Sequence, residues 1–370
     1  MKRALGILFA LMMLLLVGCG KSEESDFPEG GIIGSMPLAY AKNFSVDYCA
    51  GGAAHLRIGE GQDFLLLPEG ADVPADLDAL PRIPLPVENI YLASSSVPDL
   101  FLQIAALDTV LFSSTAPEDW HIPEVREALE DERILYAGKY SAPDYELLLT
   151  EGCGLVVENT MILHSPAVKE RLEALGLPVM IEYSSYEPHP LGRVEWIKLY
   201  GLLTGKLSEA EAFFDRQLET FRAASETEPT GKTVAFFHIT PNGAVVVRRA
   251  ADYVTRMIEL AGGDTALKDL PGEENALSTV TIQMEAFYTM ARDADVLIYN
   301  STVGSGISTL DELLALSPLL ADFKAFREGN VWCTEQSMFQ RTSSAADMIA
   351  DMHAVIGGGT GELKYLYRIE

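Results

Sequence analysis

Aromatic and charged side chains gather within residues 183–196, and together they offer the chemistry of binding rather than of bond making. They are Tyr183, Tyr186, His189, Arg193 and Glu195. Sites for bulky small molecules are lined mainly by apolar and aromatic surface, with a few polar groups that fix the orientation of the ligand. Arg193 and Glu195 are two residues apart and cannot share one face of a helix. We therefore expect one of them to bond the protein backbone and the other to face a ligand.

A second basic and aromatic group lies further along the chain. Arg248 and Arg249 follow a predicted strand, and Tyr253 comes just after them. A guanidinium group binds a carboxylate through two parallel hydrogen bonds. Because side chains alternate along a strand, one arginine should point inward, and we assign Arg249 to the site. His238, at a strand end, and Met338, in a loop, are further candidates for the wall of the site, with core packing as an equally good alternative.

Asparagine and hydroxyl side chains follow two buried strands. Asn159 comes after the strand expected over residues 154–157, and Asn300 and Ser301 come after the one over residues 296–299. In open α/β sheets, ligands gather outside the carboxyl ends of the strands, which makes these side chains cleft candidates. Capping of the following loop or helix is an equally good interpretation.

The sequence argues against a metal centre and against the common catalytic motifs. Its histidines are scattered without ligand spacing, so we assign no metal site. It lacks the serine-hydrolase elbow and the zinc-protease helix, and the glycine-rich residues 357–361 lack the lysine of a phosphate-binding loop. Cys49, Cys153 and Cys333 lie far apart, with no CxxC spacing and no electropositive setting. We therefore expect no enzyme activity and no cofactor.

The charge and length of the chain set two further limits. The 370 residues carry a formal net charge of -27 at pH 7. Nucleic acid binds through Lys and Arg side chains that neutralise phosphates, so this balance excludes it as a partner. The length suits two domains of ordinary size.

Two series of alternating strands and helices must position the candidate residues. The first runs over residues 44–190 and opens with a hairpin over residues 54–67; the second runs over residues 227–370. Between them, residues 191–226 carry apolar side chains at helical spacing, although Gly205 could divide this helix. We predict an α/β fold: two lobes with Rossmann-like, mostly parallel sheets, joined by a single long helix, with a ligand cleft between them.

The N-terminus has the features of an export signal. Lys2 and Arg3 precede an apolar run over residues 5–17, which is short for a spanning helix but suits a signal peptide. The run ends in Leu-Val-Gly-Cys at residues 16–19, which resembles the lipobox of bacterial lipoproteins. In such proteins the cysteine is acylated and becomes the mature N-terminus.

This resemblance implies where the protein lies. Residues 1–18 would be removed, and lipid on Cys19 would hold the chain on the outer face of the membrane without a spanning helix. Residues 19–43 would then be the lipidated N-terminus and a flexible tether. We infer a bacterial cell with a single membrane as the host.

The candidate segments also carry a family resemblance. Residues 140–146, Tyr-Ser-Ala-Pro-Asp-Tyr-Glu, and residues 184–196 resemble the substrate-binding lipoproteins of ABC importers. The class is the one that binds iron siderophores, haem or cobalamin, such as the vitamin B12 and ferrichrome binding proteins. The second segment is the most specific, because a proline-containing turn follows a strand and Arg193-x-Glu195-Trp196 opens the connecting helix. The resemblance covers nearly the whole chain after the tether and implies only modest closure of the lobes.

The resemblance implies a function and partners. The protein would be a monomer that captures a siderophore, haem or cobalamin outside the cell and delivers it to an ABC permease dimer and its ATPase. The sequence leaves the choice among these ligands open. A receptor for bare zinc or manganese with the same fold, or a membrane-anchored enzyme or sensor, is the alternative.

The resemblance also implies two docking residues. In this family each lobe presents a glutamate, in the helix before a strand, that docks on an arginine of the permease; the matching positions are Glu146 and Glu285. The sequence shows an internal echo here, since each glutamate lies about ten residues before a buried strand that ends in Asn and hydroxyls. We expect Glu285 in a helix from Thr281 to Ala291. Two ordinary solvated carboxylates are the alternative.

Overall fold

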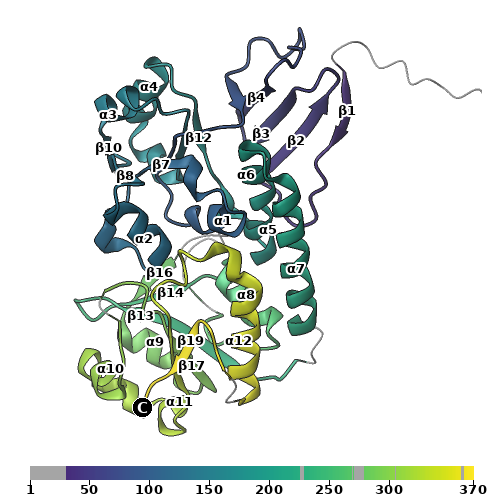
Figure 1. Cartoon of the computed structure of the whole chain (residues 1–370). Helices are drawn as coiled ribbons and strands as arrows, with labels where there is room; N and C mark the ends of the chain where they lie inside the picture. The colour runs from purple at the N-terminus through teal and green to yellow at the C-terminus, as the bar shows by residue number, and fades with distance from the viewer. Residues whose placement is uncertain (1–30, 226–228, 269, 271–278, 305, 360–361) are drawn as a thin grey trace, which may run out of the picture.

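The chain folds into two α/β lobes, which lie one above the other in Figure 1 with a run of helices from the middle of the chain beside them. The structure is a computed structural model and describes residues 31–370 apart from 226–228, 269, 271–278, 305 and 360–361. The predicted signal peptide, Cys19 and residues 20–30 of the predicted tether lie outside the described residues. The rest of that segment is folded rather than a flexible tether, because Ile32–Ser35 pairs with Phe44–Cys49 and the backbone of residues 39–43 is bound by Glu195 and Glu187. Within them, no helix is long and apolar enough to cross a membrane.

The N-terminal lobe is built on a parallel sheet with the strand order β12-β11-β6-β7-β8. Its strands are β6 (Ile90–Leu92), β7 (Val110–Ser113), β8 (Leu135–Tyr136), β11 (Leu155–Glu158) and β12 (Val179–Ile181). The helices of this lobe are α1 (Pro98–Gln103), α2 (Pro123–Glu130), α3 (Tyr145–Thr150) and α4 (Pro166–Ala174), and a ribbon pairs β9 (Gly138–Lys139) with β10 (Ala142–Pro143). Most residues of the three central strands are buried, which is typical of a parallel sheet with both faces covered. The predicted alternation is confirmed.

A separate sheet, with the order β1-β2-β3-β4-β5, precedes this one in the chain. Its strands are β1 (Ile32–Ser35), β2 (Phe44–Cys49), β3 (Ala54–Ile58), β4 (Gln62–Pro68) and β5 (Arg82–Leu85). The predicted hairpin is β3 and β4, with Ala54 opposite Leu66 and Ile58 opposite Gln62. Val46 and Leu56 face the core beneath it. The first lobe therefore has a mainly antiparallel layer beside its parallel sheet.

The connecting segment contains one long helix, as predicted, but it is not continuous over residues 191–226. It consists of α5 (Pro190–Glu195), α6 (Ile197–Thr204) and α7 (Leu207–Ser225). Gly205 ends α6 in the left-handed conformation, with φ 72°. A Cβ atom on Gly201 would lie 2.6 Å from the Cβ of Ala210, so α6 and α7 pack closely side by side. The 19-residue α7 is the long helix that runs beside the lobes (Figure 1).

The C-terminal lobe has a mixed sheet with the order β16-β14-β13-β17-β18-β19, and β15 also pairs with β13. Its strands are β13 (Thr233–Ile239), β14 (Val245–Arg248), β15 (Asp264–Thr265), β16 (Thr279–Ile282), β17 (Val296–Tyr299), β18 (Val331–Thr334) and β19 (Leu366–Arg368). Its helices are α8 (Tyr253–Leu260), α9 (Met284–Ala291), α10 (Leu310–Leu316), α11 (Lys324–Arg327) and α12 (Ala345–Gly357). The central strands are parallel and the edge strands antiparallel. The predicted helix start at Thr281 is wrong, because Thr281 pairs with Val246 in the sheet.

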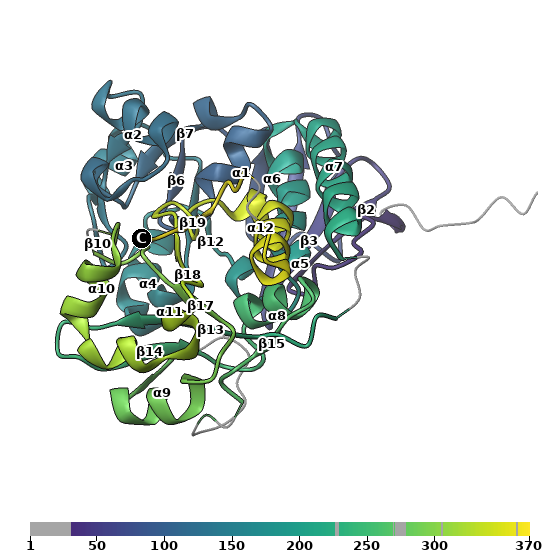
Figure 2. The same ribbon diagram turned by 90° about the horizontal axis from the view of Figure 1, so that it is seen from below.

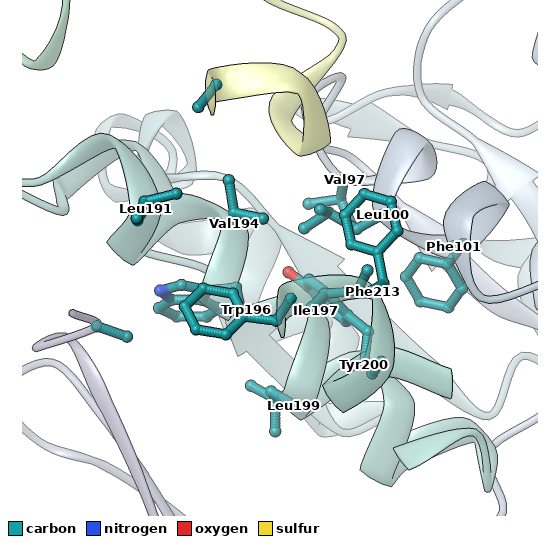
Figure 3. Close-up of a cluster of buried hydrophobic side chains, with 14 of the residues drawn as sticks. Val97, Leu100, Phe101, Leu191, Val194, Trp196, Ile197, Leu199, Tyr200 and Phe213 are labelled. Carbon is teal, nitrogen blue, oxygen red and sulfur yellow. The ribbon is translucent and has the colours of Figure 1, made fainter. Parts of the chain in front are cut away.

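One apolar core runs through both lobes and the connecting helices. Figure 3 shows part of it, where Leu100 and Phe101 of α1 lie near Ile197 and Tyr200 of α6. The rings of Phe101 and Tyr200 are 5.0 Å apart. Seen from below, α12 lies beside α8 and α5 and continues this core into the C-terminal lobe (Figure 2). Packed side chains thus hold the two lobes against each other. Such packing limits their relative movement, which is consistent with the expected modest closure of the lobes around a ligand.

Candidate functional site

The carboxyl ends of the N-terminal parallel strands meet the C-terminal lobe at a cavity of about 340 Å³. The N-terminal lobe and α5 supply Ser94, Ser95, Ser96, Asn159, Thr160, Met161, Ser185 and Arg193. The C-terminal lobe supplies Arg248, Asp252, Tyr253 and Phe339. Ligands of open α/β sheets bind at such a position. One wall is thus rich in hydroxyls, and the other side brings cations and aromatic rings.

Arg193 is a buried cation that faces this cavity. It lies in the short helix α5, which begins with Pro190 after the N-cap His189. Its side chain stacks on Tyr253, with Cζ 3.9 Å from the ring centroid, and the residue is only 7% exposed. Its Nε has no hydrogen-bond partner among the described residues. A buried charge without a counter-ion is costly, so this guanidinium is suited to receive an anion.

Arg248 is the second cation of the cavity, and its position is fixed by two contacts. Nη1 lies 3.3 Å from Oδ2 of Asp252, and Oδ1 of the same carboxylate accepts a hydrogen bond from the backbone N–H of Val254 at the start of α8. The guanidinium lies over Phe339, 4.7 Å from the ring centroid. Arg249, the arginine assigned to the site from the sequence, does not line the cavity. That assignment is corrected to Arg248.

The opposite wall is a set of hydroxyl and amide groups held by their own hydrogen bonds. The hydroxyl of Ser94 donates to Glu182 at 2.8 Å, and the backbone N–H of Ser184 donates to the other oxygen of the same carboxylate at 2.8 Å. The amide of Asn159 donates to the carbonyl of Ala93 at 2.7 Å, while its oxygen caps a 3₁₀ helix. Asn159 therefore lines the cavity and caps the following turn, the two roles that the sequence left open.

Glu195 takes the backbone-binding role that we expected for one member of the Arg193 and Glu195 pair. Its carboxylate accepts hydrogen bonds from the backbone N–H groups of residues 39–41 at 2.7 to 3.0 Å, and it pairs with Lys198 at 2.8 Å. Glu187 accepts from the N–H groups of residues 42–43 and from Trp196 Nε1. These two carboxylates fasten the chain before β2 onto α5, which leaves Arg193 to the cavity.

Two other residues of the 183–196 segment pack inside the protein instead of facing the cavity. His189 is the N-cap of α5, where its Nδ1 accepts from the N–H of Leu191 at 3.1 Å, and its ring lies 4.5 Å from that of Tyr40. Burial lowers the pKa of His189 to about 4, so it is neutral at pH 7. Tyr183 packs against Gly59 in the turn between β3 and β4. Both were expected to line the cleft, and neither does, because the turn directs them toward the first sheet and α7.

Four further candidates lie outside the lining of the cavity. They are Tyr186, His238, Asn300 and Ser301. Tyr186 is 42% exposed, and its hydroxyl lies 3.5 Å from that of Thr160 at the rim. His238 bonds the carbonyl of Asn300 at 3.2 Å, and burial lowers its pKa. The backbone N–H of Ser301 donates to the hydroxyl of Thr334 at 2.9 Å, whereas its own hydroxyl is buried without a partner among the described residues. These groups lie at the ends of β13 and β17 in the C-terminal sheet and not in the lining of the cavity.

Several lining residues escaped the sequence argument. They are Ser94, Ser95, Ser96, Met161, Ser185 and Asp252. The three serines form a hydroxyl-rich run directly after β6, and that run was a usable signal, because it stands at the carboxyl end of a predicted strand. Met161 and Asp252 carry no such signal in the sequence.

The described residues contain no cluster of three or more His, Cys, Asp or Glu side chains that could hold a metal ion. Cys49, Cys153 and Cys333 are buried and free. Burial raises the pKa of Cys153 to about 12 and that of Cys333 to about 11, so both are thiols at neutral pH. Thiols in this form are poor nucleophiles.

The two glutamates expected to dock on a permease occupy equivalent positions in the two lobes. Glu146 lies in the first turn of α3, before β11, and Glu285 lies in the first turn of α9, before β17. Both are exposed. In the described part of the chain neither forms an ion pair, so both carboxylates are available to a partner.

Two α/β lobes with a cavity at the strand ends between them define a bilobal binding protein. The model of the periplasmic binding protein family matches residues 135–337, and the chain belongs to this family. The predicted class and the two-lobed α/β fold are thereby confirmed.

Relatives and solved structures agree with this assignment. An uncharacterized lipoprotein of Methanocaldococcus jannaschii is 24% identical over 377 residues, which cover 91% of this chain and 88% of the relative. The periplasmic haem-binding protein HutB of Vibrio cholerae matches with a TM-score of 0.58 and 17% identity, over 71% of this chain and 97% of that one. A periplasmic haem-binding protein of Pseudomonas aeruginosa matches with a TM-score of 0.57 and 18% identity, over 76% and 96%. The structural matches show the shared fold.

Proposed function

We propose that this protein is the extracytoplasmic substrate-binding component of an ABC importer and that its cargo is an anionic metal chelate. It captures the chelate between its lobes and delivers it to the permease dimer, which the ATPase drives. Anionic iron siderophores and haem are the leading cargo classes, and cobalamin, which has a phosphate group but no free carboxylate, is the third. It carries out no bond-breaking chemistry on the cargo.

The observation that carries this proposal is the buried guanidinium of Arg193, which shares the cavity with Arg248 and has no ion pair among the described residues. In a chain with a net charge of -27, two cations at one interlobe cavity form a local exception. Tyr253 and Phe339 add ring surface, which a bulky chelate requires. The haem-binding function of the structural neighbours supports a chelate, and the lack of a metal-ligand cluster among the described residues agrees with a cargo that brings its own ligands.

The arginines can be tested with a matched pair of neighbouring variants. Arg248→Gln should weaken binding of an anionic ferric chelate roughly 10- to 100-fold, because a charge-assisted hydrogen bond contributes about 1.5–3 kcal/mol. Arg249→Gln, one residue further and outside the lining, should bind within about twofold of the wild type. Isothermal titration calorimetry on both proteins measures the difference. Equal losses in the two variants, or a loss only for Arg249→Gln, would return the site to the arginine assigned from the sequence.

Docking on the permease is a separate part of the proposal. Replacing Glu146 and Glu285 together with alanine should lower transport roughly tenfold or more, since each lost ion pair at an interface costs about 2 kcal/mol or more. Affinity for the cargo should stay unchanged, because both side chains lie away from the cavity. Uptake of labelled chelate and in vitro binding are measured in parallel. The control is Glu130→Ala with Glu328→Ala, which removes one exposed carboxylate from each lobe; transport by the Glu146 and Glu285 variant at the level of this control would end the docking proposal.

Lipid on Cys19 would place the receptor beside its permease. Relatives named as lipoproteins support this anchor. A tether made of the residues between Cys19 and β1, at ~5–6 Å × √n for a flexible chain, would keep the lobes within about 2 nm of the membrane, because residues 32–43 already belong to the folded lobe. In a cell with a single membrane, the anchor would prevent the loss of receptor and cargo by diffusion.

A further inference from the structure

A second, inner chamber lies behind the interlobe cavity and shares part of its wall. Arg193, Tyr253 and Phe339 line both spaces. The chamber has a volume of about 10 Å³ in which a water-sized atom can be centred. Such a volume holds about one water molecule or one oxygen atom of a ligand. The groups that line it therefore surround essentially one atomic position.

Two polar atoms of the chamber wall have no partner among the described residues. They are Nε of Arg193 and Oγ1 of Thr342. The two residues are 7% and 6% exposed, so bulk water does not satisfy them. A buried donor without a hydrogen-bond partner costs free energy of folding. Native proteins therefore usually pair such atoms with a protein group, a water molecule or a ligand. A guanidinium and a hydroxyl from two residues that line one chamber can supply two donors to an oxygen that carries negative charge.

Thr342 is held in place by its neighbours in the chain. Asp99 of α1 is fully buried, accepts a hydrogen bond from the N–H of Ser343 at 2.8 Å and lies 3.6 Å from Arg341. Gln340 binds the carbonyl of Asp119 at 2.9 Å. These contacts cross between the lobes and fix the segment that carries the hydroxyl, so the donor is positioned before a ligand arrives.

The rest of the chamber offers little competition for these donors. Met257, Met338 and Met348 supply thioether and methylene surface, and thioether sulfur is a weak acceptor. Arg341, the other charged group in the lining, is already directed to Asp99 and Glu124. An oxygen that entered the chamber would therefore be bound mainly by Arg193 and Thr342.

We propose that the inner chamber is a subsite for one carboxylate arm of the cargo, with Arg193 Nε and Thr342 Oγ1 as the donors to a single carboxylate oxygen. This inference rests on the proposed function. The main cavity holds the body of the chelate. The inner chamber adds affinity only when the chelate carries a carboxylate that can reach behind Tyr253. Thr342 is thereby a specificity-determining residue that distinguishes carboxylate chelates from neutral ones.

The test compares two ferric complexes on the full chain in detergent. The probes are ferric citrate, which carries free carboxylates, and ferrichrome, a neutral trihydroxamate complex. Thr342→Val keeps the shape of the side chain and removes the hydroxyl, and should weaken binding of ferric citrate about five- to tenfold, as expected for one lost hydrogen bond to a charged group. Thr342→Ser keeps the hydroxyl and should bind ferric citrate within about twofold of the wild type. Affinity for ferrichrome, where it binds, should be the same in all three proteins.

Each outcome bears on one of the two proposals. Equal affinity of the wild type and Thr342→Val for ferric citrate would mean that the chamber holds only a water molecule, and the inference would fail while the proposed function stands. Binding of ferrichrome but not of ferric citrate by the wild type would overturn the carboxylate subsite together with the anionic character of the cargo, while the role of chelate receptor would stand. Binding of neither complex, nor of haem or cobalamin in the same assay, would overturn the proposed function together with it.

Discussion

Replacing Glu195 with alanine should lower the free energy of unfolding by about 3–5 kcal/mol, the usual cost of removing one partner from a buried ion pair. Glu195 is fully buried, and its loss leaves the backbone N–H groups of residues 39–41 without this acceptor and Lys198 with the carbonyl of Pro37 in place of a counter-ion. Urea unfolding at pH 7 measures the change. The matched control is Glu209→Ala, an exposed carboxylate near the start of α7, which should change stability by less than about 1 kcal/mol.

The pH dependence gives Glu195 a second signature. Burial alone would raise its pKa, but hydrogen bonds from Lys198 and from the backbone lower it below its ordinary value. A carboxyl group with a depressed folded-state pKa contributes stability that is present above its unfolded pKa and is lost as the pH falls through the folded pKa. The difference in free energy of unfolding between the wild type and Glu195→Ala should therefore become smaller as the pH falls into the acid range. A stability loss below about 1 kcal/mol at pH 7 would contradict the role of Glu195 in fastening the N-terminal segment.

Replacing Glu158 with glutamine should stabilise the protein in weakly alkaline solution. Glu158 is the last residue of β11 and is fully buried, and neither of its carboxyl oxygens has a partner among the described residues. Burial raises the pKa of this carboxyl from 4.5 to about 8. Stability linked to such a group is fully present below pH 4.5 and is lost as the pH rises toward 8.

The difference between the folded and unfolded pKa of Glu158 sets the expected change in stability. At ~1.4 kcal/mol per pKa unit, wild-type stability should fall by about 3 kcal/mol between pH 4.5 and 7 from this group alone. Glu158→Gln lacks the titration, so it should match the wild type near pH 5 and exceed its stability by about 3 kcal/mol or more at pH 8. Urea unfolding across this range tests it, with the exposed Glu151→Gln as the control. Parallel pH profiles for wild type and Glu158→Gln would show that Glu158 is ionised or hydrated in the folded protein.

The fold was largely readable from the sequence because its strands and helices carry strong local patterns. The hairpin of β3 and β4, the helix α4 behind its Ser-Pro start, and the buried strands β11 and β17 all follow from apolar periodicity and turn residues. Edge strands were harder. Of residues 279–282, which form β16, only Ile282 is buried, and β19 has three residues, so neither has enough apolar pattern to reveal its pairing.

The site could be predicted only in part from the sequence. The sequence gives the spacing of side chains along a strand but does not show which alternate side chains point into the core. Val245 and Val247 pack into the core of the C-terminal lobe, which places Val246 and Arg248 on the other face. Three valines in a row do not show which face is inward, so Arg249 was chosen. His189 was assigned to the cleft because a histidine in a turn looks like a ligand contact, whereas its ring packs against Tyr40 and Phe221.

The central claim is that the cavity at Arg193 and Arg248 holds an anionic metal chelate. The most direct measurement is calorimetric titration of the wild type with ferric citrate, a ferric siderophore, haem, cobalamin, zinc and manganese at the same pH and ionic strength. We predict saturable binding of at least one of the chelates, with affinity lost in Arg248→Gln. Binding of free zinc or manganese alone, or binding of a chelate that is unaffected by Arg248→Gln and by Arg193→Gln, would contradict the proposal.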